Sequence, residues 1–185
     1  MGIPGSMTGR AVFLDRDGVV NRAIVRRGRP YAPRRLEDLE ILPGVHDSIA
    51  ALKQRGYLIF IVTNQPEVSR GSIPRHSVED MHGQLQRELP VDGILACFHD
   101  DDDDCDCRKP RAGLLLQAAR DFSLDLSCSF MVGDRWRDIE AGKRAGCATL
   151  FVDHAYAEEP PAGYDHRVGS LAEACALILA QRDPT

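Results

Sequence analysis

The feature that most constrains this chain of 185 residues is a short apolar run, Ala11 to Leu14, that ends in Asp15-Arg16-Asp17-Gly18. Such a run is typical of a strand buried on both faces of a parallel sheet. In open α/β sheets, ligands bind beyond the carboxyl ends of the strands, where Asp15 and Asp17 fall. Because alternate residues of an extended chain point the same way, both carboxylates are expected to face one site. Taken alone, a strand that ends in a polar turn explains the pattern equally well.

Segments that predict strands alternate with segments that predict helices, as in βαβ units on a parallel sheet. Further strands are expected at 57–62, 93–98, 129–132 and 147–152, and helices at 45–55, 74–88, 111–121, 136–145 and 170–180. The polar segment 21–41, rich in arginine and proline, predicts a long loop. The expected fold is a three-layer, Rossmann-like α/β sandwich with a mainly parallel sheet and no insertion large enough for a separate cap domain.

Composition excludes some classes of protein. A hydrophobic content of 43% with 28% charged residues is ordinary for a globular protein, and the net charge of -5 gives no reason to expect nucleic acid as a partner. No apolar run approaches the length of a membrane span. We therefore expect a soluble, cytoplasmic monomer that binds neither nucleic acid nor membranes. Residues 1–6 resemble a vector-derived tag ahead of Met7, which leaves 7–185 as a single domain.

Polar side chains follow the predicted strands. They are Asp15 and Asp17 after the first, Thr63, Asn64 and Gln65 after the second, and Asp134 after the fourth, while Arg108 and Lys109 precede a helix. Carboxylates can hold Mg²⁺, which prefers oxygen ligands. A hydroxyl, an amide and two cations suit a phosphoryl group, whose transfer depends mainly on positioning and charge neutralisation. Any one of these residues could equally be a helix cap or a surface residue. The ordered set, however, indicates phosphoryl transfer, with a carboxylate available as nucleophile.

A second cluster consists of Cys97, His99, Cys105 and Cys107. Three thiolates and one imidazole at this spacing predict a tetrahedral Zn²⁺ site in the loop 97–107, and a site filled by four protein ligands is structural. One alternative is a Cys105–Cys107 disulfide, which a reducing compartment and the close spacing disfavour. Another is a hard cation on the five aspartates 100–104, which would leave the thiols unexplained.

Four motifs occur in order along the chain. They read D-x-D-G from Asp15, T-N-Q from Thr63, C-R-K-P from Cys107 and V-G-D-x-x-x-D from Val132. This set resembles the haloacid dehalogenase superfamily of phosphohydrolases. The pairing of L-D-R-D-G-x-x-N with C-x-H and C-x-C-R-K-P is similar to the subgroup of D-glycero-D-manno-heptose 1,7-bisphosphate phosphatases and histidinol phosphatases. After T-N-Q that subgroup often reads S-G-[IV]-x-R-G, whereas this chain has P-E-V-S-R-G at 66–71.

The resemblance implies a role for each matched residue. Asp15 is the nucleophile and Asp17 the general acid and base. Thr63 and Lys109 hold the phosphoryl group. Mg²⁺ is bound by Asp15, Asp134 and the main-chain carbonyl of Asp17. The implied substrate contacts are Asn64, Gln65, Arg108 and Arg135, the last of which stands where the subgroup usually has lysine.

The expected activity is a Mg²⁺-dependent phosphatase acting on a small phosphorylated sugar. The resemblance implies removal of the C7 phosphate of D-glycero-D-manno-heptose 1,7-bisphosphate, for nucleotide-activated heptose used in surface polysaccharide. The alternatives are a histidinol-phosphate phosphatase and a zinc-stabilised binding module without turnover. Arginines at 26–35 suit a second phosphate on the substrate, or equally a solvated basic loop. Because Cys107 directly precedes Arg108 and Lys109, the zinc loop is expected to preorganise both cations.

Overall fold

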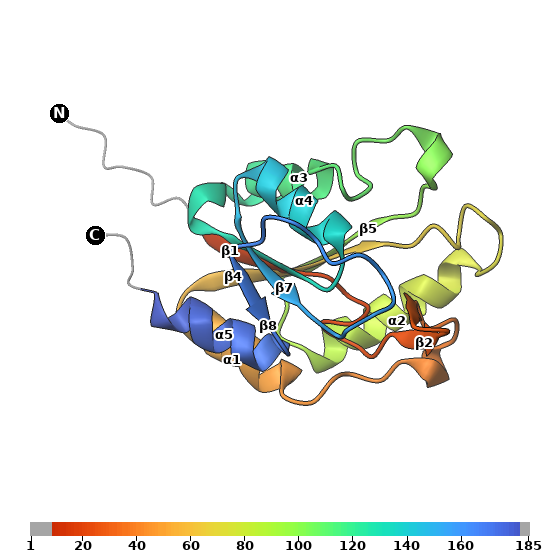
Figure 1. Cartoon of the computed structure of the whole chain (residues 1–185), viewed down its shortest axis with the longest axis horizontal. Helices are drawn as coiled ribbons and strands as arrows, with labels where there is room; N and C mark the ends of the chain where they lie inside the picture. Colours follow the sequence, from red (N-terminus) through yellow and green to blue (C-terminus); the bar gives the residue numbers. More distant parts are fainter. Residues whose placement is uncertain (1–8, 182–185) are drawn as a thin grey trace.

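The computed structural model describes residues 9–181, in which six parallel strands form the central sheet. In spatial order the strands are β5 (Gly93–Cys97), β4 (Tyr57–Asn64), β1 (Arg10–Leu14), β6 (Phe130–Gly133), β7 (Ala148–Val152) and β8 (His166–Val168). The first strand of the chain therefore lies inside the sheet, with β4 and β6 as its neighbours. Helices cover both faces, which confirms the expected three-layer α/β sandwich (Figure 1).

Two large hydrophobic cores fill the space between the sheet and the helices, and a smaller cluster contains Ile73, Val78 and Met81. On one face lie α1 (Val45–Gln54), α2 (Arg75–Glu88) and α5 (Leu171–Ala180), and on the other lie α3 (Gly113–Phe122) and α4 (Trp136–Ala145). Strand β1 serves both cores because its side chains alternate. Val12 and Leu14 pack in the first core, and Ala11 and Phe13 in the second. All four are fully buried, which explains the unbroken apolar run.

The segment 21–41 is more ordered than the expected long loop. It contains an antiparallel hairpin of β2 (Ile24–Arg26) and β3 (Arg29–Tyr31), followed by a short 3₁₀ turn, η1 (Leu36–Asp38). Arg27 and Gly28 form the turn with φ of 52° and 76°. Positive φ at both central positions suits a two-residue hairpin, but Asn or Asp is the usual signal for the first position. Because Arg27 occupies this position, the sequence does not predict the turn.

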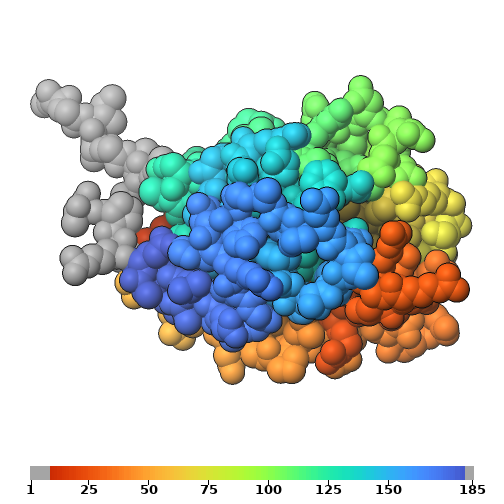
Figure 2. Space-filling model, viewed as in Figure 1, coloured from red at the N-terminus to blue at the C-terminus, as the bar shows by residue number. Residues whose placement is uncertain are grey.

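Three loop regions meet at one end of the molecule. They are the hairpin β2–β3, the segment that follows β4 around Arg70, and the Cys/His-rich segment 97–107 (Figure 2). Strand β8 was not expected from the sequence, because it has three residues and His166 and Arg167 are exposed. No helix within residues 9–181 has the length and apolar character needed to cross a bilayer. The expected tag at 1–6 lies outside the described residues, so the proposed division of the chain stays a prediction.

Candidate active site

The site is centred on an ion pair between Asp15 and Lys109. Asp15 follows β1, and its Oδ1 accepts a hydrogen bond of 2.6 Å from the ammonium of Lys109. The same ammonium lies 2.6 Å from the carbonyl oxygen of Val62 and 2.6 Å from Oδ1 of Asp138. Asp15, Lys109 and Asp138 are all buried. One lysine thus links the strand ends of β1 and β4 to the start of α4.

Burial and charge shift the protonation of these groups. Burial and the carboxylate of Asp138 raise the pKa of Asp15 to about 7, against the opposing effect of Lys109. Burial would lower the pKa of Lys109, but the carboxylates of Asp138 and Asp15 outweigh it and raise that pKa above its usual value. Lys109 is therefore cationic at neutral pH, and it is available to neutralise charge that develops next to Asp15.

Three buried carboxylates form a potential metal site. Oxygens of Asp15, Asp134 and Asp138 all lie within 4.8 Å of one another. Both carboxylate oxygens of Asp134 are buried, neither makes a hydrogen bond of ordinary geometry within residues 9–181, and the nearby hydroxyl of Tyr156 only opposes the rise in the pKa of this group. Burial, Asp15 and Asp138 raise the pKa of Asp134 well above its usual value. Crowded, desolvated acids with free oxygens fit a divalent cation with hard oxygen ligands, because such an ion offsets their mutual repulsion.

Asp17 is held apart from this carboxylate cluster by a set of hydrogen bonds. Arg16 donates to both of its oxygens, at 3.1 and 3.0 Å. The amides of Asn21 and Gln65 donate to one oxygen each, at 3.0 and 2.9 Å. Asp17 still lines the same pocket as Asp15. The two acids therefore face one pocket with different partners, Lys109 for the first and Arg16 for the second.

Of the three polar residues at the end of β4, two line the pocket and the third supports them. Thr63 and Asn64 line the pocket. Asn64 also exchanges two hydrogen bonds with the backbone of Lys109, at 2.9 and 3.1 Å, and so fixes that residue. Gln65 is fully buried, and its amide donates to Asp17 and to the hydroxyl of Thr63. In this structure Gln65 positions two site residues, and it does not line the pocket.

An open pocket of about 350 Å³ leads from Asp15 to the surface, a size within the usual range of small-molecule sites. Its arginines come from the hairpin, the β4 loop, the Cys/His segment and α4: Arg29, Arg70, Arg108, Arg135 and Arg137. Arg135 is paired with Glu158, with Nη2 to Oε1 at 2.7 Å. The expected substrate contacts Arg108 and Arg135 therefore both reach the pocket, as does Arg29 of the arginine-rich segment 26–35. Arg70 and Arg137 also line it, and neither was identified from the sequence.

The four zinc ligands expected from the sequence come together. The Sγ atoms of Cys97, Cys105 and Cys107 lie 3.1 to 3.7 Å apart, and Nδ1 of His99 lies 3.6 Å from Cys97 and 3.3 Å from Cys107. Zn–S bonds of about 2.3 Å place tetrahedral sulfur atoms about 3.8 Å apart, so the cluster has the size of a Zn²⁺ site. All three cysteines are free, which is inconsistent with the alternative Cys105–Cys107 disulfide.

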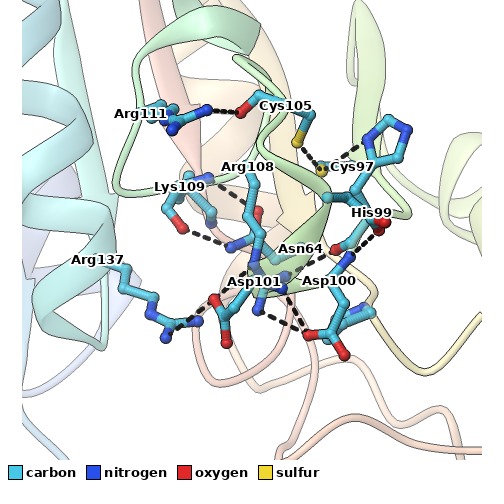
Figure 3. Close-up of polar contacts among 12 residues, drawn as sticks. Asn64, Cys97, His99, Asp100, Asp101, Cys105, Arg108, Lys109, Arg111 and Arg137 are labelled. Carbon is cyan, nitrogen blue, oxygen red and sulfur yellow. Dashed lines mark hydrogen bonds and ion pairs between the residues drawn. The ribbon is translucent and has the colours of Figure 1, made fainter. Parts of the chain in front are cut away.

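Three of the five aspartates between these ligands, Asp100, Asp101 and Asp104, pair with arginines, and within residues 9–181 the five do not form a metal-ligand cluster. Asp100 binds Arg70 through both oxygens at 2.5 Å. Asp101 accepts from Nε of Arg108 at 2.9 Å and lies 3.3 Å from Nη2 of Arg137 (Figure 3). These contacts tie the acidic turn to the rim of the pocket. Arg108 also donates to the carbonyl of His99 at 3.1 Å, which connects the cysteine cluster directly to the pocket.

Some residues of the site were not identified from the sequence. Asp138 is the last residue of the V-G-D-x-x-x-D motif, so the signal for it was present. Asn21 closes the L-D-R-D-G-x-x-N motif in the same way. His82, which has no ligand spacing in the sequence, lies on α2, where it is buried and contacts Arg16. Its position depends on how α2 packs on the sheet, for which the local sequence holds no signal.

Comparison with known proteins gives concordant matches. The family model for haloacid dehalogenase-like hydrolases matches residues 7–146. The D-glycero-beta-D-manno-heptose-1,7-bisphosphate 7-phosphatase of Helicobacter pylori (strain J99) is 37% identical over 144 residues, covering 75% of this chain and 79% of that protein. The corresponding alpha-anomer enzyme of Campylobacter jejuni is 34% identical over 151 residues, covering 79% and 83%. The crystal structure of D,D-heptose 1,7-bisphosphate phosphatase from B. bronchiseptica, complexed with magnesium and phosphate, superimposes with a TM-score of 0.79 at 30% identity, covering 92% and 98%.

Proposed function

The chain belongs to the haloacid dehalogenase-like hydrolase family, and we propose that it removes the C7 phosphate of D-glycero-D-manno-heptose 1,7-bisphosphate, leaving heptose 1-phosphate for nucleotide-activated heptose. The observation that carries the proposal is the Asp15–Lys109 pair at the base of a pocket lined by five arginines. A nucleophile beside a fixed cation suits phosphoryl transfer, and cations further out suit a substrate with a second phosphate. The enzyme is proposed to act as a monomer.

The first step is transfer of the phosphoryl group to Asp15. A carboxylate oxygen of Asp15 attacks phosphorus, and the bond from phosphorus to the sugar oxygen breaks. Asp17 donates its proton to that oxygen, so the sugar leaves as an alcohol. Lys109 and the hydroxyl of Thr63 bind the phosphoryl oxygens and stabilise the negative charge on them in the transition state.

The second step is hydrolysis of the aspartyl-phosphate. Asp17, now ionised, takes a proton from a water molecule, and the water oxygen attacks phosphorus. The bond from phosphorus to Asp15 breaks, which regenerates the carboxylate and releases phosphate. A single residue therefore serves first as acid and then as base, and its carboxyl group has to be oriented toward the leaving oxygen and later toward the water.

The metals are assigned from the two clusters of ligands. Asp15 and Asp134, with the main-chain carbonyl of Asp17, are proposed to hold Mg²⁺, and Asp138 is a further candidate because its carboxylate belongs to the same cluster. A bound Mg²⁺ would neutralise phosphate charge and orient the group for attack. Cys97, His99, Cys105 and Cys107 are proposed to hold a structural Zn²⁺ that fixes the segment carrying Arg108 and Lys109.

The function is tested by phosphate release from both anomers of heptose 1,7-bisphosphate, from histidinol phosphate and from 4-nitrophenyl phosphate, each with and without Mg²⁺. The expected result is the highest kcat/KM with one heptose anomer and dependence on Mg²⁺. Asp15→Asn should abolish turnover, and its retention would contradict the assigned nucleophile. Preference for histidinol phosphate would overturn the substrate, and no release from any compound would support a binding module.

A further inference from the structure

Arg16 is fully buried even though its guanidinium is permanently charged. A charge in this position has to be paired, because an unpaired buried ion carries a large desolvation cost. Two of its donor nitrogens, Nε and Nη2, contact the two carboxylate oxygens of Asp17 at 3.1 and 3.0 Å. The two-point contact fixes the plane of the carboxylate relative to that of the guanidinium.

The third nitrogen of this guanidinium is held by His82. Nη1 of Arg16 lies 3.0 Å from Nε2 of His82, which projects from α2 and is buried. Because a guanidinium can only donate, Nε2 must be the acceptor, and the ring must be neutral. Burial and the charge of Arg16 lower the pKa of His82 to about 4, so the ring stays neutral at physiological pH.

The contacts form a continuous connection from α2 to the site. With Nη1 bound by His82 and the other two nitrogens bound by Asp17, the guanidinium is fixed on both sides. Asn21 and Gln65 also donate to the carboxylate, but their amides are uncharged and each makes a single hydrogen bond to it. The plane of the Asp17 carboxyl group therefore depends mainly on Arg16, and the placement of Arg16 on His82.

We propose that His82 is a positioning residue for catalysis: it holds Arg16, and Arg16 orients the carboxyl group of Asp17 for both proton transfers. The proposal rests on the acid and base role of Asp17 given above. Under this proposal α2 affects the chemical steps through Arg16, although no residue of α2 contacts the reacting atoms. The effect is expected on the chemical steps rather than on substrate binding, because His82 does not line the pocket.

The choice of substrate separates this role from simple structural support. The leaving group of 4-nitrophenyl phosphate departs without being protonated, so its first step does not need Asp17 as an acid. Its second step still needs Asp17 as a base. A misplaced Asp17 should therefore leave the initial burst of nitrophenolate intact and slow the steady state. With an alkyl phosphate such as heptose bisphosphate, both steps should be slow.

The experiment compares His82→Leu, which removes the acceptor, with His82→Gln, whose amide oxygen can replace Nε2. Leu85→Ala is the matched control, because Leu85 is a buried residue of the same helix that packs in the hydrophobic core and does not line the pocket. All variants are measured in the presence of Mg²⁺ with 4-nitrophenyl phosphate, by burst and steady-state kinetics, alongside their thermal unfolding temperatures.

With 4-nitrophenyl phosphate, His82→Leu is expected to lower the steady-state kcat about tenfold to a hundredfold, the scale associated with small misplacements of a catalytic group. KM should fall with kcat and leave kcat/KM little changed, because only the hydrolysis of the aspartyl-phosphate is slowed. The burst should persist, and His82→Gln should recover most of the loss. Leu85→Ala should be less stable yet keep its kcat. An unchanged kcat in His82→Leu, or a loss that follows stability equally in His82→Leu and Leu85→Ala, would overturn the proposal.

Two further measurements remove ambiguity. If His82→Leu does not fold, His82→Ala is assayed with and without added imidazole; recovery of kcat supports the proposal and no recovery overturns it. Asp17→Asn is run in the same assays. If Asp17→Asn keeps the wild-type rate, the proposed function of Asp17 fails. If Asp17→Asn is impaired while His82→Leu is not, only the role of His82 fails.

Discussion

The ammonium nitrogen of Lys109 lies 2.6 Å from Oδ1 of Asp138. Lys109 is thereby shared between Asp138 and the nucleophile Asp15, which it contacts at the same distance. The backbone amide of Arg135 donates to the other oxygen of Asp138 at 3.0 Å. Asp138 therefore joins the first turn of α4 to the centre of the site, and it affects both the cation and the nucleophile.

Replacing Asp138 with asparagine should weaken Mg²⁺ binding and lower kcat/KM by about 10- to 100-fold, the usual effect of losing a group that supports a metal site. It should also lower the pKa of Asp15 below about 7, because the carboxylate of Asp138 is one of the causes of the raised value. Mg²⁺ titration and the acidic limb of the pH–rate profile measure the two effects. Glu140→Gln, on the exposed side of α4, is the control. Unchanged Mg²⁺ affinity would contradict the assigned role.

Mg²⁺ affinity should depend on pH through Asp15. Its raised pKa, about 7, means that the metal-free protein keeps this group protonated at lower pH and ionised at higher pH. Because a metal ligand must be ionised, binding below pH 7 has to release a proton. The apparent affinity should rise at least about tenfold per pH unit up to about pH 7, and more steeply where Asp134, whose pKa is also raised, has to lose a proton as well. Calorimetric titrations in buffers of different ionisation enthalpy count the protons, and an affinity independent of pH would contradict the linkage.

Removal of zinc should lower activity even when Mg²⁺ is restored. The cysteine cluster directly precedes Arg108 and Lys109, and Arg108 also donates to the carbonyl of His99. Cys105→Ser should therefore lose zinc and reduce kcat/KM by about tenfold or more. Cys128→Ser, a cysteine outside the cluster, should keep both metal and activity. Elemental analysis measures the zinc content of each assayed sample. Full activity in a verified zinc-free sample would exclude the preorganising role.

Arg137 should contribute to recognition of the second phosphate. It lines the pocket and shares the carboxylate of Asp101 with Arg108. Loss of a charge-assisted hydrogen bond worth about 1.5–3 kcal/mol predicts that Arg137→Gln raises KM for the bisphosphate about tenfold or more. KM for heptose 7-phosphate should change little. Arg111→Gln, which removes the partner of Asp104 outside this pocket, is the control. Equal changes with both substrates would exclude this role.

Local sequence was sufficient for most of the fold and for the residues that follow the strands. The run Ala11 to Leu14 reads as a strand because both of its faces are buried, and Asp15 is placed by the end of that strand. The hairpin β2–β3 was not predicted because Arg27 occupies a turn position with positive φ. Strand β8 was not predicted because it has three residues and only Val168 is buried.

The contacts that support the site were harder to predict than the site residues themselves. The pairing of Arg16 with His82 joins positions 66 residues apart, through the packing of α2 against the sheet. Neither residue differs from a surface residue in its sequence context. The arginines of the pocket come from four separate segments, and only the folded chain brings them to one rim. Such groupings depend on tertiary structure, which periodicity and motif spacing do not encode.

The position of β1 between β4 and β6 has a consequence for the dynamics of the enzyme. Asp15 and Asp134 follow β1 and β6, and Thr63 lies at the end of the adjacent strand β4, so separating them requires rupture of the sheet. Backbone amides of these strands should exchange with solvent only through near-global opening. Within residues 9–181 the hairpin β2–β3 is a separate two-stranded sheet, to which the amide of Ala157 adds a hydrogen bond at Gly28, and its amides should exchange through local opening. The hairpin can thus change in sequence, and with it the preferred substrate, at little cost to the strands that hold the reacting groups.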